Sequence, residues 1–174
     1  MKKYNRWISF IALAVLYSCS GTKKASVNTD VNNLKFTAEA APDWTNLLDR
    51  KKGWFGSDGI FAIPATGNDN TDATTDITLL FGDSMIGEVI DNQPPQPGYV
   101  MVHNSVALLK GNEPKEENIK FYWKKTASGN EGTFFVPRTS NTKSGDYYWL
   151  GDGFVNPDLD DKTYIFCYRI RDQW

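Results

Sequence analysis

Two stretches decide the fold: Gly-Trp-Phe-Gly-Ser-Asp-Gly-Ile-Phe-Ala-Ile-Pro at residues 53–64, and Asp-Ile-Thr-Leu-Leu-Phe-Gly-Asp-Ser-Met-Ile-Gly-Glu at residues 76–88. Each places an aspartate beside glycine next to a short apolar run, with Asp58 before one run and Asp83 after the other. The runs are rich in strand-forming residues, and glycine permits backbone conformations that other residues avoid. The pattern predicts two neighbouring strands with a carboxylate at the end of each.

The two aspartates have two interpretations. Carboxylates at strand ends lie where loops meet a rigid sheet, and catalytic and binding groups are often found there. Aspartate beside glycine is also ordinary turn chemistry, so both residues can be turn residues without a function. The spacing alone leaves the two interpretations open.

Composition excludes several classes of protein. The 174 residues suit one domain, and 14% of them are aromatic, which favours an all-β protein or a surface that faces carbohydrate. The net charge is −2 without a basic stripe, so nucleic acid is not an expected partner. Two cysteines make neither a disulfide framework nor a metal site, and His103 is the sole histidine. We therefore predict no metal and no cofactor.

The N-terminus has the pattern of a targeting segment. Basic residues at positions 2, 3 and 6 precede an apolar stretch at residues 7–16, which is too short to span a bilayer. Leu-Tyr-Ser-Cys follows at residues 16–19 and resembles the lipobox of bacterial lipoproteins, in which the cysteine is lipidated. An ordinary signal peptide with a chance cysteine is the alternative. We expect a lipid anchor at Cys19.

This pattern divides the chain into three parts. Residues 1–18 are the predicted lipoprotein signal peptide, residues 19–42 a polar tether, and residues 43–174 the folded domain. The anchor would join the protein to a membrane without spanning it. The expected location is the bacterial cell envelope, on the outer membrane, facing either the periplasm or the surface.

The folded part reads as strands separated by turns. One or two helical turns are expected after Asp43, and no further helix. Polar clusters rich in Gly, Pro, Asn and Asp separate the first four predicted strands, which is typical of an antiparallel meander: residues 59–63, 77–82, 99–109 and 119–124. Strand signals return later, and the last places Cys167 as a small buried residue: residues 133–136, 147–155 and 163–170.

A short internal repeat links the two halves of the domain. Trp-Phe-Gly-Ser-Asp-Gly-Ile-Phe at residues 54–61 is echoed by Trp-Leu-Gly-Asp-Gly-Phe at residues 149–154. Self-similarity separated by about one four-stranded unit is typical of radial repeat folds such as β-propellers. Turns of the Gly-Asp-Gly kind also arise by chance.

Four motifs, taken in order, carry a resemblance to known families. They are residues 54–61, Leu-Phe-Gly-Asp-Ser-Met-Ile-Gly-Glu at 80–88, Met-Val-His-Asn-Ser-Val-Ala at 101–107 and Ile-Lys-Phe-Tyr-Trp at 119–123. This order resembles the uncharacterised-domain families 5005 and 4185, found on secreted bacterial proteins and similar to five-bladed β-propeller glycoside hydrolases. The 4185 group is similar to endo-D-arabinanases of glycoside hydrolase family 183. The resemblance covers residues 43 onward.

The resemblance implies catalytic roles for three aspartates. In such propellers, acidic residues from the first strands of successive blades converge on a central funnel. Asp58 would be the base or nucleophile, Asp152 a partner that positions it or tunes its pKa, and Asp83 a residue that holds substrate or orients Asp58. Glycoside hydrolysis needs two carboxylates, one of them a general acid.

The same resemblance implies residues that bind saccharide. His103 and Asn104 could hydrogen-bond sugar hydroxyls, and Trp54 and Trp149 could stack on sugar rings. A satisfied strand histidine and aromatic packing in the core are the alternatives for these residues. The expected partner is a polysaccharide or oligosaccharide, with arabinan among the candidates, and a monomer is expected.

The strands number too few for a whole propeller. We count about one and a half to two blades, so an all-β fold forming the N-terminal part of a five-bladed β-propeller is expected. The missing general acid would come from a later blade, and the chain would be a fragment of a longer hydrolase. The alternative is a small β-sandwich that binds glycan without cleaving it. A structural envelope lipoprotein is a third possibility.

Overall fold

The computed structural model describes residues 35–69, 72, 74–95 and 98–171. It divides into two units, of which the second, residues 40–174, holds every helix and strand described. Cys19 and the predicted signal peptide lie outside the described residues, as does most of the predicted tether. Within the described part of the chain, no helix is long and apolar enough to cross a membrane.

One short helix precedes the strands. Helix α1 (Pro42–Leu48) has a proline at its start, where the missing N–H costs nothing, and it buries Leu47. The strands and two 3-10 turns follow in this order: β1 (Lys52–Ser57), β2 (Ile60–Pro64), β3 (Ile77–Phe81), β4 (Ser84–Glu88), β5 (Tyr99–Val102), β6 (Ser105–Leu109), η2 (Glu116–Asn118), β7 (Ile119–Tyr122), β8 (Lys124–Lys125), β9 (Glu131–Gly132), β10 (Tyr147–Asn156), η3 (Pro157–Leu159) and β11 (Lys162–Ile170).

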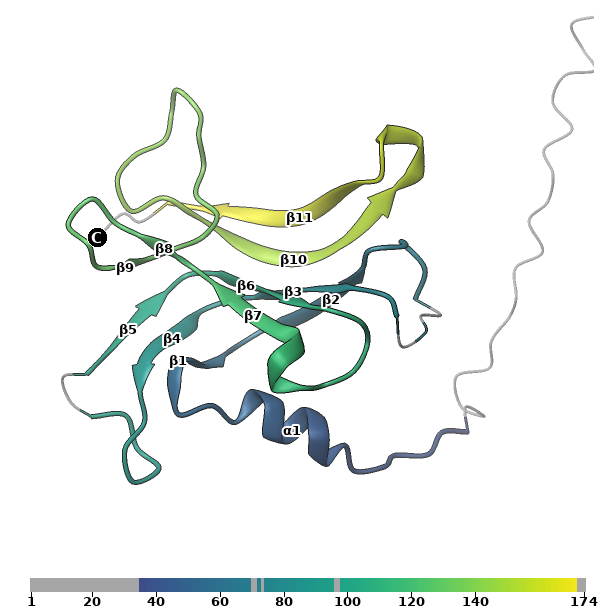
Figure 1. Cartoon of the computed structure of the whole chain (residues 1–174). Coiled ribbons are helices and arrows are strands. Elements are labelled where there is room, and N and C mark those ends of the chain that lie inside the picture. Colours follow the sequence, from purple (N-terminus) through teal and green to yellow (C-terminus); the bar gives the residue numbers. More distant parts are fainter. Residues whose placement is uncertain (1–34, 70–71, 73, 96–97, 172–174) are drawn as a thin grey trace, which may run out of the picture. The chain divides into compact units, whose positions relative to one another are not determined.

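The predicted meander is present. Strands β2, β3, β6 and β7 form an antiparallel sheet in that order, and β1, β4 and β5 form a second antiparallel sheet (Figure 1). Sequence reasoning missed β1 and β4, and it joined β5 to β6 as one strand. The two sheets share one antiparallel register. Ser57 pairs with Ser84, and three residues later in the first strand and three earlier in the second, Ile60 pairs with Phe81. The chain therefore builds long strands that are interrupted near their middle.

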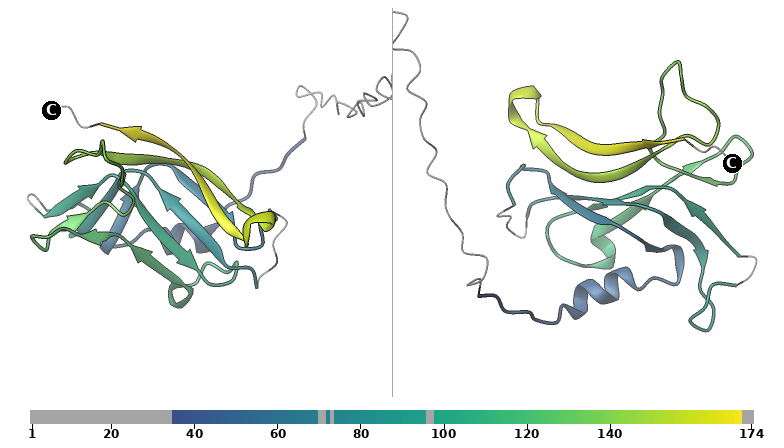
Figure 2. Two further views of the ribbon diagram at one scale, coloured as in Figure 1. Left: turned by 90° about the horizontal axis from the view of Figure 1, so that it is seen from above. Right: turned by 180° about the vertical axis from the view of Figure 1, so that it is seen from behind.

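The four-stranded sheet is covered on both faces. Alternate residues of β3 point to opposite faces, as a strand requires: Leu79 and Phe81 join a core with α1, whereas Leu80 joins a second core. That second core includes Leu150 and Val155 of β10. Figure 2 shows the β10–β11 hairpin lying over this sheet. Burying both faces removes most of the apolar side chains of β3 and β6 from water, with Leu108 left exposed, at roughly 25 cal/mol for each Å² buried.

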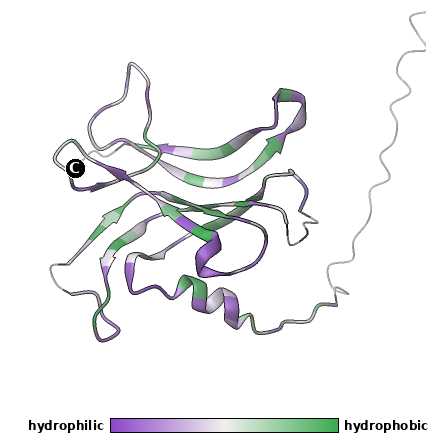
Figure 3. Ribbon diagram, in the orientation of Figure 1, coloured by the Kyte–Doolittle hydropathy of each residue, from purple (hydrophilic) through white to green (hydrophobic). Residues whose placement is uncertain are grey.

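The hairpin leaves its other face open. Trp149 pairs with Tyr168 and Phe154 with Tyr164 across the two strands, and all four side chains are exposed. Phe166 is exposed on the same face. Hydrophobic stretches are visible in both strands in Figure 3.

The expectation of an all-β fold is confirmed: the described residues contain one short α-helix and several antiparallel sheets. The arrangement fits part of a β-propeller and also fits a sandwich. Two local predictions were wrong. Residues 133–136 form no strand, and Cys167 is an exposed free thiol because its strand lies at an open edge.

Candidate functional site

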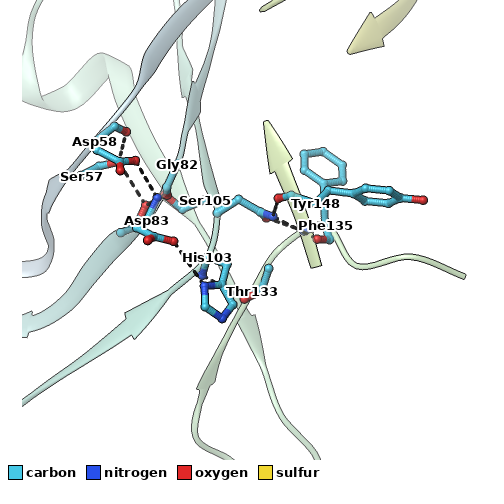
Figure 4. A network of polar contacts seen from close by, with 11 residues as sticks. Ser57, Asp58, Gly82, Asp83, His103, Ser105, Thr133, Phe135 and Tyr148 are labelled. Atoms are coloured by element: carbon cyan, nitrogen blue, oxygen red, sulfur yellow. Dashed lines mark hydrogen bonds and ion pairs between the residues drawn. The ribbon is translucent and has the colours of Figure 1, made fainter. Parts of the chain in front are cut away.

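Three breaks in neighbouring strands lie side by side and form the candidate site. Residues 58–59 separate β1 from β2, residues 82–83 separate β3 from β4, and residues 103–104 separate β5 from β6. The shared register of the two sheets places these breaks opposite one another, so polar groups far apart in sequence meet (Figure 4). The backbone leaves the regular ladder at this line, which exposes side chains that a continuous strand would direct into its faces.

Asp58 and Asp83 are joined through the backbone. The Asp58 N–H donates to the Asp83 carbonyl over 3.1 Å, and the Gly82 N–H donates to the Asp58 carbonyl over 3.0 Å. The Asp83 N–H donates to Asp58 Oδ1 over 2.9 Å. A Cβ on residue 82 would lie 2.1 Å from Asp58 Oδ1, so any other residue there would displace the Asp58 carboxylate from this hydrogen bond. The Gly-Asp pair that stood out in the sequence is therefore required by this close approach.

Asp83 also pairs with the only histidine. His103 Nδ1 lies 3.3 Å from Asp83 Oδ1, and the two side chains are 34% and 37% exposed. The imidazole stacks on Tyr147 with ring centroids 3.7 Å apart and planes 12° apart. The backbone N–H of His103 donates to Thr133 Oγ1 over 3.0 Å. The ring is fixed on one side and open to solvent at its edge. An oriented carboxylate–imidazole pair that a ligand can reach suits proton transfer or hydrogen bonding to hydroxyls.

Asn104 has a different role from the one expected. Its side chain is fully buried, and Nδ2 donates to the carbonyls of Phe135 (3.0 Å) and Tyr148 (2.7 Å). Oδ1 accepts the Phe135 N–H over 2.7 Å. The amide is thereby engaged as both donor and acceptor, so it is not available to sugar hydroxyls. Asn104, which directly follows His103, instead links the break between β5 and β6 to the segment before β10 and to β10 itself.

Two serines behind the breaks were missed by sequence reasoning. Ser84 and Ser105 are fully buried, with their hydroxyls 2.7 Å apart, and Ser84 Oγ donates to the Gly82 carbonyl over 2.8 Å. Each serine directly follows a break pair, and this shared position is the sequence signal that could have identified them. They bridge β4 and β6 beneath the aspartates and hold the breaks together.

Asp152 is not joined to this cluster. It lies at a bulge of β10, where the register with β11 shifts between Leu150 and Gly153, and its Oδ1 accepts the Gly153 N–H over 2.7 Å. With Asp69 it lines a separate pocket of about 160 Å³. None of the interactions of Asp152 in the described part of the chain involves Asp58, Asp83 or His103.

The two tryptophans of the internal repeat have opposite environments. Trp54 is 3% exposed and packs against Phe81 and Phe121, with ring centroids 4.7 and 4.6 Å away. It offers no face to a sugar, and the core alternative holds for it. Trp149 is 48% exposed on the open face of the hairpin and remains available to a ligand.

No metal centre is described. Among the residues with described positions, no group of three or more His, Cys, Asp or Glu side chains could hold a metal ion. The candidate site is the cluster of Asp58, Asp83 and His103, supported by the buried side chains of Asn104, Ser84 and Ser105.

Comparison with solved structures finds a distant fold relative. A crystal structure of a "putative hydrolase" from Bacteroides ovatus ATCC 8483 matches with a TM-score of 0.55 and 17% sequence identity. The match covers 76% of this chain and 34% of that one, so the chain spans about a third of the length of its relative. At this identity the likeness shows the fold. No curated protein matches the chain.

The family is shown by a match over most of the domain. The model of the family described as Domain of unknown function (DUF5005) matches residues 42–173. This range contains every residue of the candidate site, and it agrees with the first of the two families that the sequence motifs resemble. The chain belongs to the DUF5005 family.

Proposed function

We propose that the chain carries part of a saccharide-hydrolysing site built around Asp83 and His103. The observation that carries the proposal is the cluster of Asp58, Asp83 and His103, in which both members of the exposed pair are held in place by separate contacts. The fold likeness to a hydrolase supports the class of reaction. The substrate would be a polysaccharide, and arabinan is the first to test.

The geometry favours a division of roles that differs from the one expected from the sequence. Glycosidases use carboxylates as general acid and as base or nucleophile. Asp58 Oδ1 fixes the backbone of Asp83, while the Asp83 carboxylate faces solvent beside an imidazole. We assign the base or nucleophile to Asp83, orientation of its carboxylate to His103, and positioning to Asp58, while the general acid that protonates the leaving-group oxygen would be a residue outside this cluster. Asp152 lines a separate pocket and takes no part in this division of roles.

The proposed setting is the bacterial envelope. The basic start, the short apolar stretch and Cys19 support a lipid anchor followed by a tether. Such an anchor would hold the domain close to polysaccharide outside the cytoplasm. Labelling with a radioactive fatty acid, with Cys19→Ser as the control, tests this part separately from catalysis.

The assay is the release of reducing ends from arabinan and a panel of other polysaccharides by the purified protein. Asp83→Asn should lower kcat by roughly 100-fold or more, because it removes the proposed base. Asp58→Asn keeps an oxygen that can accept the Asp83 N–H and should retain most activity, whereas Asp58→Ala should lose it. Activity abolished by Asp58→Asn would return the base to Asp58. Hydrolysis unaffected by Asp83→Asn would reject the proposed site.

A second candidate function is glycan binding without hydrolysis. It is favoured by the open aromatic face of the hairpin, where Trp149, Phe166 and Tyr168 are exposed together. Aromatic side chains offer a large apolar area with little loss of side-chain freedom. If this function holds, Trp149→Ala and Tyr168→Ala abolish the retardation of the protein in polysaccharide-containing gels, and no reducing ends are released.

A further inference from the structure

A groove beside the candidate site has the composition of a binding site for a ring that carries a negative charge. It has a volume of about 540 Å³ and lies between β8, the segment before β10 and the start of β10. Its walls include three aromatic side chains, and its rim carries two cations: Phe134, Phe135, Tyr148, Lys124 and Arg138. Ligand pockets are typically apolar with a few polar groups that fix orientation.

Among the residues that the structure describes, the two cations have no acidic partner. The Lys124 amine lies over the Phe134 ring, 5.4 Å from its centroid, and within the described residues neither Lys124 nor Arg138 forms an ion pair. The neighbouring Lys125, in contrast, pairs with Glu131. Burial, together with the positive charge of Arg138, lowers the pKa of Lys124. Two like charges thus line one groove without compensation.

Two other arginines of the domain do not share this property. Arg50 donates to both carboxylate oxygens of Glu116, and Arg169 pairs with the buried Asp146. Lys124 is half-buried and Arg138 is exposed, and an anion bound between these two like charges would offset their repulsion. The planar guanidinium of Arg138 matches a carboxylate, which it can bind through two parallel hydrogen bonds.

We propose that this groove is a subsite for a uronic acid residue, whose carboxylate is bound by Arg138 and Lys124 and whose ring packs on Phe134 and Tyr148. The saccharide part of this inference rests on the proposed function, and the anionic part rests on the groove itself. The substrate class is therefore a polysaccharide with carboxylate-bearing sugars.

The groove is tied directly to the candidate site. Asn104, which follows His103 in the chain, donates hydrogen bonds to the backbone carbonyls of Phe135 and Tyr148. A single buried amide thus links the groove wall to the residue that orients Asp83.

Isothermal titration calorimetry of the purified protein tests the inference with three probes of equal length: an oligogalacturonate, a neutral arabino-oligosaccharide and a sulfated oligosaccharide. We expect the oligogalacturonate to bind tightest, and Arg138→Gln and Lys124→Gln each to weaken it about tenfold, equivalent to ~1.4 kcal/mol. The matched control Lys125→Gln removes a neighbouring charge that is already paired and should change affinity less than twofold. Raising the salt concentration should weaken binding.

Several results would overturn the inference. Equal affinity for the neutral probe, no effect of Arg138→Gln, or tighter binding of the sulfated probe would each reject a uronic acid subsite. Displacement of the oligogalacturonate by acetate at equal concentration would reduce the groove to a simple anion site and reject the saccharide part.

The failures of the two proposals are distinguishable. Oligogalacturonate binding that depends on Arg138, without any hydrolysis, would support the subsite and reject the proposed hydrolase. Hydrolysis of neutral arabinan that depends on Asp83 but not on Arg138 would support the hydrolase and reject the subsite.

Discussion

The N–H of Asp83 donates to Asp58 Oδ1 over 2.9 Å, across two strands that are 25 residues apart in the chain. The contact closes a break in both strands at the same level, and Gly82 is the residue that lets the two approach. The candidate site is thus part of the sheet's own hydrogen bonding, and changes to it affect stability as well as ligand binding.

Asp58→Ala should destabilise the domain by about 1 kcal/mol, because the Asp83 N–H loses its side-chain acceptor at a partly solvated position. Asp58→Asn should cost less, since its amide oxygen can accept the same bond. Denaturation in urea measures both. A larger loss for Asn than for Ala would show that the negative charge, rather than the hydrogen bond, stabilises the break.

Asn104→Ala should destabilise by about 3 kcal/mol or more, because it removes three hydrogen bonds from a fully buried side chain and leaves backbone groups without partners. Asn104→Asp is the sharper variant, since it keeps the shape but places a carboxylate oxygen against two carbonyls. It should be at least as destabilising as alanine near neutral pH. Wild-type stability for either variant would contradict the structural role assigned to the Asn104 side chain.

The acid stability of the domain should depend on Asp146. The hydrogen bond from Arg169 and the Lys143 N–H hold the pKa of Asp146 below its ordinary value of 3.8. Because the unfolded chain then binds the proton more tightly, this group stabilises the fold above pH 3.8, and the contribution is lost as the pH falls through the lower folded value.

Asp146→Asn should therefore flatten the dependence of unfolding free energy on pH in this acid range, while lowering stability near neutral pH. Arg169→Gln is the matched variant, because it removes the source of the lowered pKa and leaves the carboxyl in place. Thermal unfolding from pH 2 to 7 measures both. An acid limb as steep as that of the wild type in both variants would contradict the assignment.

The two repeat tryptophans should respond oppositely to truncation. Trp54→Ala should cost about 3–5 kcal/mol, because Trp54 fills the core beside Phe81 and Phe121. Trp149→Ala should change stability by about 0.5 kcal/mol or less, since its ring is half exposed. Chemical denaturation of the two variants side by side checks this. Similar losses would mean that the repeat places both rings in equivalent environments.

Much of the fold followed from the sequence by itself. Short runs of strand-forming residues between Gly-rich and Asp-rich turns fixed the all-β class and the order of the meander, because both depend on local residue types. Glycine beside Asp58 and Asp83 marked the two breaks for the same local reason. The motifs around them sufficed to identify the family.

Only the tertiary structure decided which marked residues act together. Pairing of distant strands brought His103 to Asp83 and left Asp152 elsewhere, and no local pattern encodes that register. Packing of the hairpin over the sheet buried Asn104. The exposure of a side chain depends on what covers its strand, so two similar motifs place Trp54 in the core and Trp149 at the surface.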